Sequence, residues 1–124
     1  MKFAKYVFLT AGIYGIIVIL PMYFMEAQTG IDYPPAITHP EFYYGFIGVT
    51  LAWQIAFLVI GKDPVRFRLL MIPSMFEKFL YVIAIAVLLL QQRVPSISGL
   101  FAFIDCALGI LFLISFIKTK NPAQ

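Results

Sequence analysis

The chain has 124 residues, of which 62% are hydrophobic and only 12% are charged, a composition that excludes a soluble globular domain. The formal net charge of +3 reflects Lys and Arg residues that flank apolar runs, so we expect no nucleic-acid partner. The single cysteine, Cys106, excludes an internal disulfide and a two-cysteine redox relay. We therefore expect an integral membrane protein.

Hydrophobic segments recur four times, and each is long enough to cross the hydrocarbon core of a bilayer as an α-helix. Little chain remains between them, which leaves room for one domain, residues 1–124, with short loops. The sequence therefore predicts an all-α, four-helix transmembrane bundle, with spans at Phe3–Met25, Phe42–Ile60, Leu69–Leu90 and Ser98–Ile117.

The basic residues that flank these spans are distributed unevenly between the two predicted sides of the membrane. Arg93 is the single basic residue on one side, whereas seven lie on the side of the termini. Because cytoplasmic loops carry the excess of Lys and Arg, we expect both termini and the Gly61–Arg68 loop to be cytoplasmic, in a bacterial inner membrane. The seven are Lys2, Lys5, Lys62, Arg66, Arg68, Lys118 and Lys120.

The first span places Thr10 and Tyr14 on one face at helical spacing, and Pro21 is expected to kink its outer end. The outer loop that follows, Glu26–Glu41, contains three prolines and is expected to form an ordered lid. Its His39 lies near acids, but their spacing matches no known metal motif, so we expect neither a metal ion nor a cofactor.

The second span carries different signals on its two faces. Small residues recur every four positions along Gly48–Ala56, a pattern that lets a neighbouring helix approach closely and would also support a homo-oligomer. On another face, Gln54 follows Thr50 by one turn, and a Gln in lipid should find an interhelical partner. Trp53 is expected either to form an aromatic wall beside these polar residues or to face lipid.

The third span carries two adjacent ionisable residues, Glu77 and Lys78, about two turns from its start. Charge at this depth costs roughly 2.5–3.5 kcal/mol per residue, so it usually faces protein or water and marks a functional site. Tyr81 is close enough in the helix to lie between the two charged side chains. Pro73 lacks an N–H donor for the carbonyl of Leu69 and predicts a kink or a freed carbonyl just before the pair.

The fourth span places Asp105 between Ala102 and Gly109, a groove of small residues typical of a face that meets another helix. At about 1.5 Å per residue, polar residues of all four spans fall in two neighbouring layers, about 10–14 Å and about 16–18 Å from the cytoplasmic ends. The sequence therefore predicts one buried polar site, formed by Glu77, Lys78, Asp105, Tyr81, Gln54, Thr50 and Tyr14, with Trp53 as its wall.

Three functions remain open for such a site. The first is a structural ion-pair network that fixes helix register. The second is a cavity that binds a lipid-like molecule, in a protein that acts alone or as an accessory subunit of a larger membrane complex. The third is proton-coupled transport of a small molecule, since Asp and Glu within membranes relay protons. The sequence contains no catalytic signature, so an enzyme is not favoured.

The layout of the chain between Trp53–Phe57 and the Glu77–Lys78 pair supports one comparison. Both termini are expected inside, acids lie in the outer loop, and further acids lie within the spans. This layout is similar to that of the DoxX-like and EXPERA-type four-helix membrane proteins. The second group includes sterol isomerases and sterol-binding proteins with buried carboxylates, so the resemblance implies a sterol-isomerase-like enzyme as a further alternative. The resemblance extends to the layout of the four helices and includes no diagnostic motif, so it assigns no role to any residue.

Overall fold

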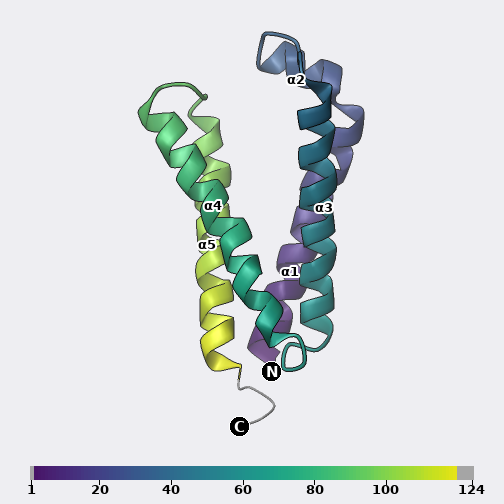
Figure 1. Cartoon of the computed structure of the whole chain (residues 1–124), viewed down its shortest axis with the longest axis vertical. Helices are drawn as coiled ribbons and strands as arrows, with labels where there is room; N and C mark the ends of the chain where they lie inside the picture. Colours follow the sequence, from purple (N-terminus) through teal and green to yellow (C-terminus); the bar gives the residue numbers. More distant parts are fainter. Residues whose placement is uncertain (1, 120–124) are drawn as a thin grey trace.

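The computed structural model describes residues 2–119, and this part of the chain is almost entirely helical (Figure 1). Within these residues, four helical stretches are long and apolar enough to cross a membrane, as expected of a small multi-pass membrane protein. The predicted all-α fold with four spans is confirmed. The elements in chain order are α1 (Lys2–Ile19), the 3₁₀ turn η1 (Leu20–Phe24), α2 (Glu26–Asp32), α3 (Pro40–Lys62), the 3₁₀ turn η2 (Arg68–Leu70), α4 (Met71–Leu90) and α5 (Ile97–Lys118).

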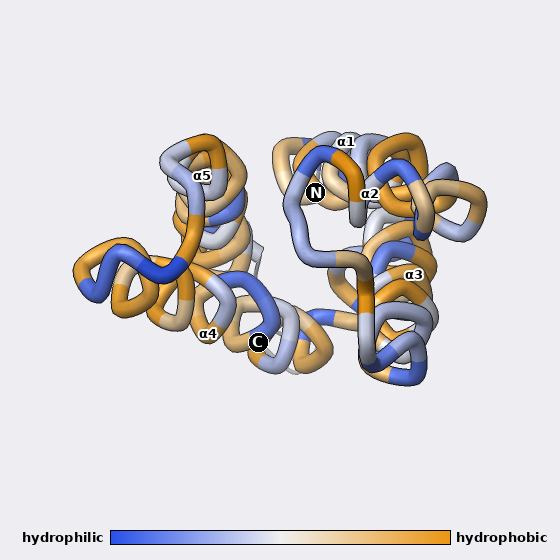
Figure 2. The backbone as a smooth tube through the Cα atoms, turned by 90° about the horizontal axis from the view of Figure 1, so that it is seen from above, coloured by the Kyte–Doolittle hydropathy of each residue, from blue (hydrophilic) through white to orange (hydrophobic). Residues whose placement is uncertain are grey.

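The long helices pair as two hairpins that diverge from one end of the molecule (Figure 1). α1 packs along α3 and α4 packs along α5, whereas contacts between the hairpins are fewer and run mainly between α1 and α5. Seen from above, the α1–α3 pair and the α4–α5 pair stand side by side with a space between their backbones (Figure 2). The bundle is therefore a V, joined at the end where Lys118 lies beside Phe3.

Aromatic packing joins the two hairpins at this closed end. Phe8 of α1 stacks on Phe112 of α5 with ring centroids 4.2 Å apart, and Phe57 of α3 meets Phe112 edge-on at 4.9 Å. All three side chains are fully buried. Stacked and edge-on aromatic pairs contribute roughly 0.5–1.5 kcal/mol each beyond the burial of their area, so this aromatic core holds the V together.

Two basic side chains reinforce the closed end. Arg68 donates two hydrogen bonds to the backbone oxygen of Phe116, at 3.2 Å from Nε and 3.0 Å from Nη2, and its Cζ lies 3.7 Å from the ring centroid of the same residue. This oxygen belongs to the last turn of α5, where carbonyls lack an intrahelical donor. Lys118 Nζ lies 4.6 Å from the ring centroid of Phe3. Together they tie η2 and α1 to the end of α5.

The close approach of α1 to α3 depends on glycines of both helices. A Cβ at Gly61 of α3 would lie 3.1 Å from the backbone nitrogen of Leu9. A Cβ at Gly12 would lie 2.8 Å from the backbone oxygen of Gln54.

By contrast, Ala52 of α3 is exposed, and a Cβ at Gly45 of the same helix would meet no atom of the described chain within 4 Å. A Cβ at Gly48 would lie 3.6 Å from Tyr23 Oη, which is an ordinary contact. Neither Gly48 nor Ala52 therefore provides the close helix packing predicted for the Gly48–Ala56 face within the described chain. Lipid-facing and helix-facing surfaces are both apolar, and small residues suit either.

The prolines and the outer loop modify the predicted spans. Pro21 falls in η1, where α1 gives way to a 3₁₀ turn, at the outer end where a kink was predicted. The Glu26–Glu41 loop is partly helical, since it contains α2. Pro73 lies in the first turn of α4, which runs from Met71 to Leu90 as one α-helix, so the proline does not interrupt the helix before Glu77. A proline in a first turn replaces an N–H that would lack a partner, and it costs little there.

Candidate functional site

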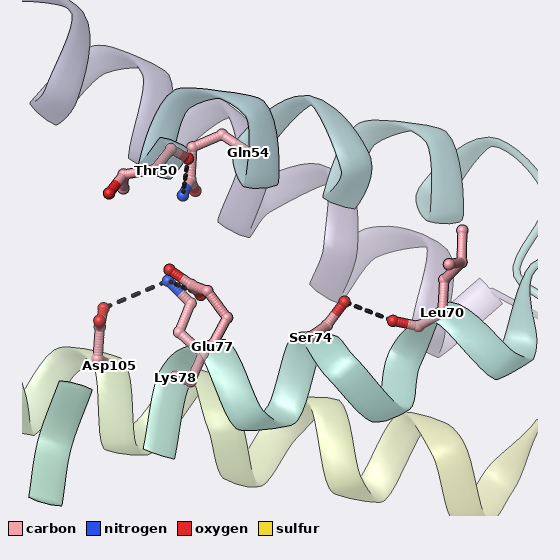
Figure 3. Close-up of polar contacts among 7 residues, drawn as sticks. All are labelled: Thr50, Gln54, Leu70, Ser74, Glu77, Lys78 and Asp105. Carbon is pink, nitrogen blue, oxygen red and sulfur yellow. Dashed lines mark hydrogen bonds and ion pairs between the residues drawn. The ribbon is translucent and has the colours of Figure 1, made fainter. Parts of the chain in front are cut away.

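An ionic cluster of Glu77, Lys78 and Asp105 lies where the two hairpins begin to separate (Figure 3). Lys78 Nζ is 3.5 Å from Glu77 Oε2 and 3.4 Å from Asp105 Oδ1. The same nitrogen lies 5.2 Å from the ring centroid of Phe57, which places the cluster next to the aromatic core. Lys78 is 4% exposed, and a buried ammonium requires such partners. The structure thus brings together the acid, base and second acid that the sequence placed at this depth.

Small residues on α5 let α4 bring Lys78 to Asp105. Ala102 and Gly109 are buried on the same side of α5 as Asp105. A Cβ at Gly109 would lie 2.8 Å from the ring of Phe79 and 3.2 Å from Lys78 Cβ. The groove predicted around Asp105 is therefore the surface on which the base of the Lys78 side chain rests.

A pocket of about 480 Å³ extends from the ionic cluster into the space between the hairpins. Its walls come from both hairpins and from α2 and the turn after it, and they are mainly apolar, with Ile19, Met22, Phe46 and Phe101 among them. The charged residues and Gln54 lie at the end next to the aromatic core, whereas Thr29 and Tyr33 contribute hydroxyls from α2 and the turn after it. Seven of the eight residues predicted from the sequence line this pocket: Tyr14, Thr50, Gln54, Glu77, Lys78, Tyr81 and Asp105.

The eighth predicted residue, Trp53, lies elsewhere. It is half-buried on α3 and packs against the aromatic core, with its ring centroid 6.3 Å from that of Phe57. Trp53 and Gln54 are neighbours in the chain, so consecutive positions of the helix direct them to different faces. The aromatic contributions to the pocket wall come instead from two phenylalanines and three tyrosines: Phe46, Phe101, Tyr14, Tyr33 and Tyr81.

Gln54 is the most buried polar side chain of the pocket, at 1% exposure. Its Nε2 donates to the Thr50 backbone oxygen at 2.9 Å, so its hydrogen bond is local to α3, and the interhelical partner predicted for it is not found among residues 2–119. This bond sets the orientation of the Gln54 amide, because exchanging its nitrogen and oxygen would place Oε1 against the backbone oxygen of Thr50. The other amide atom, Oε1, lies against Gly15 and accepts no hydrogen bond from residues 2–119.

Glu77 provides a second acceptor on the facing helix. Its Oε2 is buried and pairs with Lys78 by charge at 3.5 Å, but without the geometry of a hydrogen bond, and no other donor among residues 2–119 reaches it. Lys78 instead donates to Asp105. Figure 3 shows the ionic cluster and the side chains of Thr50 and Gln54 pointing toward one another across the pocket. Acceptor oxygens of α3 and α4 therefore face each other at its polar end.

The pocket residues that sequence reasoning missed are mostly apolar. Phe46, Phe101 and the two methionines Met22 and Met25 line the wall, but an apolar residue in a transmembrane span carries no signal that separates a pocket from lipid. Gly15 is different, since it stands next to Tyr14 and one turn from Gly12. A pair of glycines at this spacing on the first span was the available signal for where α1 meets α3.

The ionisable residues of the outer loop lie apart from this pocket. His39 Nδ1 is 3.1 Å from Glu41 Oε1, and both side chains are exposed. Across residues 2–119, no three His, Cys, Asp or Glu side chains gather closely enough to hold a metal ion.

No family model, curated protein or solved structure matches this chain. The geometry of the pocket is therefore the basis on which a function can be assigned.

Proposed function

We propose that this protein binds a lipid-like, amphipathic molecule in the pocket between its two hairpins. The observation that carries the proposal is the combination, in one pocket of about 480 Å³, of an apolar wall with a buried polar end. Sites for small molecules are commonly concave, mostly apolar and supplied with a few placed polar groups. The tail of the ligand would lie along Phe46 and Phe101, and its head group would lie at Gln54 and Glu77.

The divergence of the hairpins favours a ligand site over an ion-pair network with a purely structural role. A network that only fixed helix register would be expected to draw the helices together around its charges, because hydrocarbon does not solvate polar groups. Here the hairpins diverge from their closed end (Figure 1), and the residues of the ionic cluster line the pocket between them. Glu77 and Asp105 both line that pocket, and their side chains keep 17% and 20% of their surface exposed.

The sparse contact between α3 and α4 gives a lipid-like molecule a route to the pocket. Thr50 of α3 and Tyr81 of α4 both line it, yet these helices touch little along their length. A molecule dissolved in the bilayer would reach the polar end sideways without crossing water. The proposal also fits the likeness in layout to the DoxX-like and EXPERA-type proteins, the second of which includes sterol-binding members.

We further propose that the protein lies in a bacterial inner membrane with both termini cytoplasmic. The basic residues at the closed end of the V support this orientation, since Lys2, Lys62 and Lys118 lie there, whereas Arg93 follows the outer end of α4. Lys120, which the charge count also used, lies outside the described residues.

The exposed face of α3 around Gly45 and Ala52 leaves a surface for a second copy or for a larger membrane complex.

Retention of lipid by the purified protein tests the ligand proposal. The full chain would be purified in a mild detergent, and bound molecules would be identified by native mass spectrometry. Val18→Trp places a large side chain in the pocket wall, whereas Val59→Trp places it on the exposed face of α3. We expect the wild type and Val59→Trp to retain a lipid-like molecule and Val18→Trp to lose it. A wild-type protein that retains none and gains no stability from added lipid extract would contradict the proposal.

A further inference from the structure

The polar end of the pocket contains a hydrogen-bond acceptor that the described chain leaves unused. Gln54 lines the pocket and is 1% exposed, and its Oε1 is buried beside Gly15 and accepts no hydrogen bond from residues 2–119. A buried amide oxygen without a donor costs free energy, so such atoms usually find a partner. Its position is built by the fold, because Gly15 leaves the space that the oxygen occupies, and the bond from Nε2 to Thr50 fixes the amide.

Glu77 carries a second acceptor, the buried Oε2, without a hydrogen bond from residues 2–119, and the Glu77 side chain points toward Gln54 from the opposite hairpin (Figure 3). The cluster also has one acid more than it has bases, since Glu77 and Asp105 share Lys78. A negatively charged head group would meet two carboxylates and find the ammonium already paired. A head group with O–H or N–H donors would find two acceptors ready.

The other polar residues of the pocket do not reverse this preference. The remaining polar residues each carry a hydroxyl, which both donates and accepts hydrogen bonds and so accommodates either kind of head group: Tyr14, Thr29, Tyr33, Thr50 and Tyr81. The preference for a hydrogen-bond donor over a negatively charged head group therefore comes from Gln54 and from the excess carboxylate.

We infer that the ligand's head group donates hydrogen bonds to Gln54 and Glu77 and carries no negative charge, as in a long-chain alcohol or a protonated long-chain amine. This inference rests on the proposed function and specifies its ligand class. Such a head group would contact α3 and α4 at once, so binding would hold the two hairpins at a fixed separation.

Three probes of equal chain length test the head group: dodecanol, dodecylamine and dodecanoate, added separately at pH 7 to the full chain in a neutral detergent. A ligand that binds the folded state raises the midpoint of thermal unfolding in proportion to its affinity. We expect dodecanol and dodecylamine to raise the midpoint, and dodecanoate to bind at least about tenfold more weakly. Native mass spectrometry of the same samples would give the bound fraction.

Two variants with matched controls assign the effect to the proposed acceptors. Gln54→Met keeps the length of the side chain and removes the free oxygen, whereas Gln28→Met alters an exposed glutamine on α2 that bonds Asp32. We expect Gln54→Met to weaken the binding of dodecanol and of dodecylamine about tenfold, and Gln28→Met to leave the binding of both unchanged. Glu77→Gln removes a carboxylate charge and should weaken the binding of dodecylamine more than that of dodecanol. Glu41→Gln is its control, and equal binding of dodecylamine to Glu77→Gln and the wild type would overturn the role of Glu77.

The possible failures are distinct. Dodecanoate binding as tightly as the other two, or Gln54→Met binding all three like the wild type, would overturn the head-group inference while leaving a lipid-binding pocket in place. Failure of every probe to bind the wild type, with no retained lipid, would overturn the proposed function itself.

Discussion

Gly15 of α1 lies so close to Gln54 of α3 that a Cβ at position 15 would overlap the amide oxygen of the glutamine. One turn earlier, a Cβ at Gly12 would lie 2.8 Å from the backbone oxygen of the same glutamine. The contact that packs the first hairpin is therefore also the contact that positions the free acceptor of the pocket. The two glycines differ in what opposes them, a movable side chain at Gly15 and a fixed backbone atom at Gly12.

Gly12→Ala is expected to destabilise the protein by about 1–3 kcal/mol, the range for overpacking a filled interface. The backbone of α3 cannot rotate away, so α1 and α3 must move apart. Thermal unfolding in detergent, followed by circular dichroism, measures the loss. Gly45→Ala is the matched control, since its Cβ would meet no described atom within 4 Å, and a midpoint for Gly12→Ala equal to that of the control would refute the packing role.

Gly15→Ala is expected to separate stability from ligand retention. The opposing atoms are the end of the Gln54 side chain, which can swing away, so the loss of stability should be smaller than for Gly12→Ala. The displaced amide would no longer hold its bond to Thr50 or present its oxygen to the pocket. Native mass spectrometry should therefore show less retained ligand. Full retention in this variant would show that the position of the amide is irrelevant to binding.

Lys78→Met is expected to leave two acids facing each other without a base. Removing one partner of a fully buried pair costs roughly 3–5 kcal/mol, and the partial exposure of the carboxylates, 17% and 20%, lowers our expectation to about 2 kcal/mol. Unfolding in mixed micelles with increasing dodecyl sulfate measures the change. The triple variant Glu77→Gln, Lys78→Met, Asp105→Asn should regain most of the stability that Lys78→Met loses. Equal stability of Lys78→Met and the exposed control Lys62→Met would argue against a coupled cluster.

The ionic cluster is the part of the site that sequence reasoning located well. A charge inside an apolar run must find a partner, and helical periodicity fixes which residues share its face. Counting 1.5 Å per residue then places Lys78 and Asp105 at neighbouring depths although they lie on different helices. Two strong constraints, the cost of burying charge and the geometry of the helix, thus act on the same three residues.

The opening of the bundle could not be derived in the same way. Lipid tails are as apolar as a helix interface, so hydropathy does not show which faces meet, and the small residues of α3 were assigned to packing that α1 provides through Gly12. Gln54 was expected to bond across helices, but a carbonyl four residues back on its own helix was available. Pro73 was placed inside a helix because hydropathy marks an apolar run and not the residue at which α4 begins.

Arg68→Lys is expected to loosen the closed end by about 1–2 kcal/mol, the scale for losing charge-assisted hydrogen bonds together with a cation–π contact. A lysine presents a single ammonium and cannot donate twice in the plane of a guanidinium while stacking on Phe116. Arg66→Lys is the control, because Arg66 is exposed and its Cζ lies 5.2 Å from the ring centroid of Phe67. Thermal unfolding compares the two, and equal midpoints would mean that the Phe116 contact adds nothing.

Labelling of single cysteines tests the proposed orientation, on which the direction of the pocket depends. In a Cys106→Ser background, Ser96→Cys and Lys62→Cys place exposed thiols at opposite ends of the spans. A membrane-impermeant maleimide added to intact cells should label Ser96→Cys and not Lys62→Cys, and permeabilised cells should label both. Labelling of Lys62→Cys in intact cells would reverse the topology. Since the pocket opens away from the end that carries Lys62, its ligand would then come from the cytoplasmic leaflet instead of the outer one.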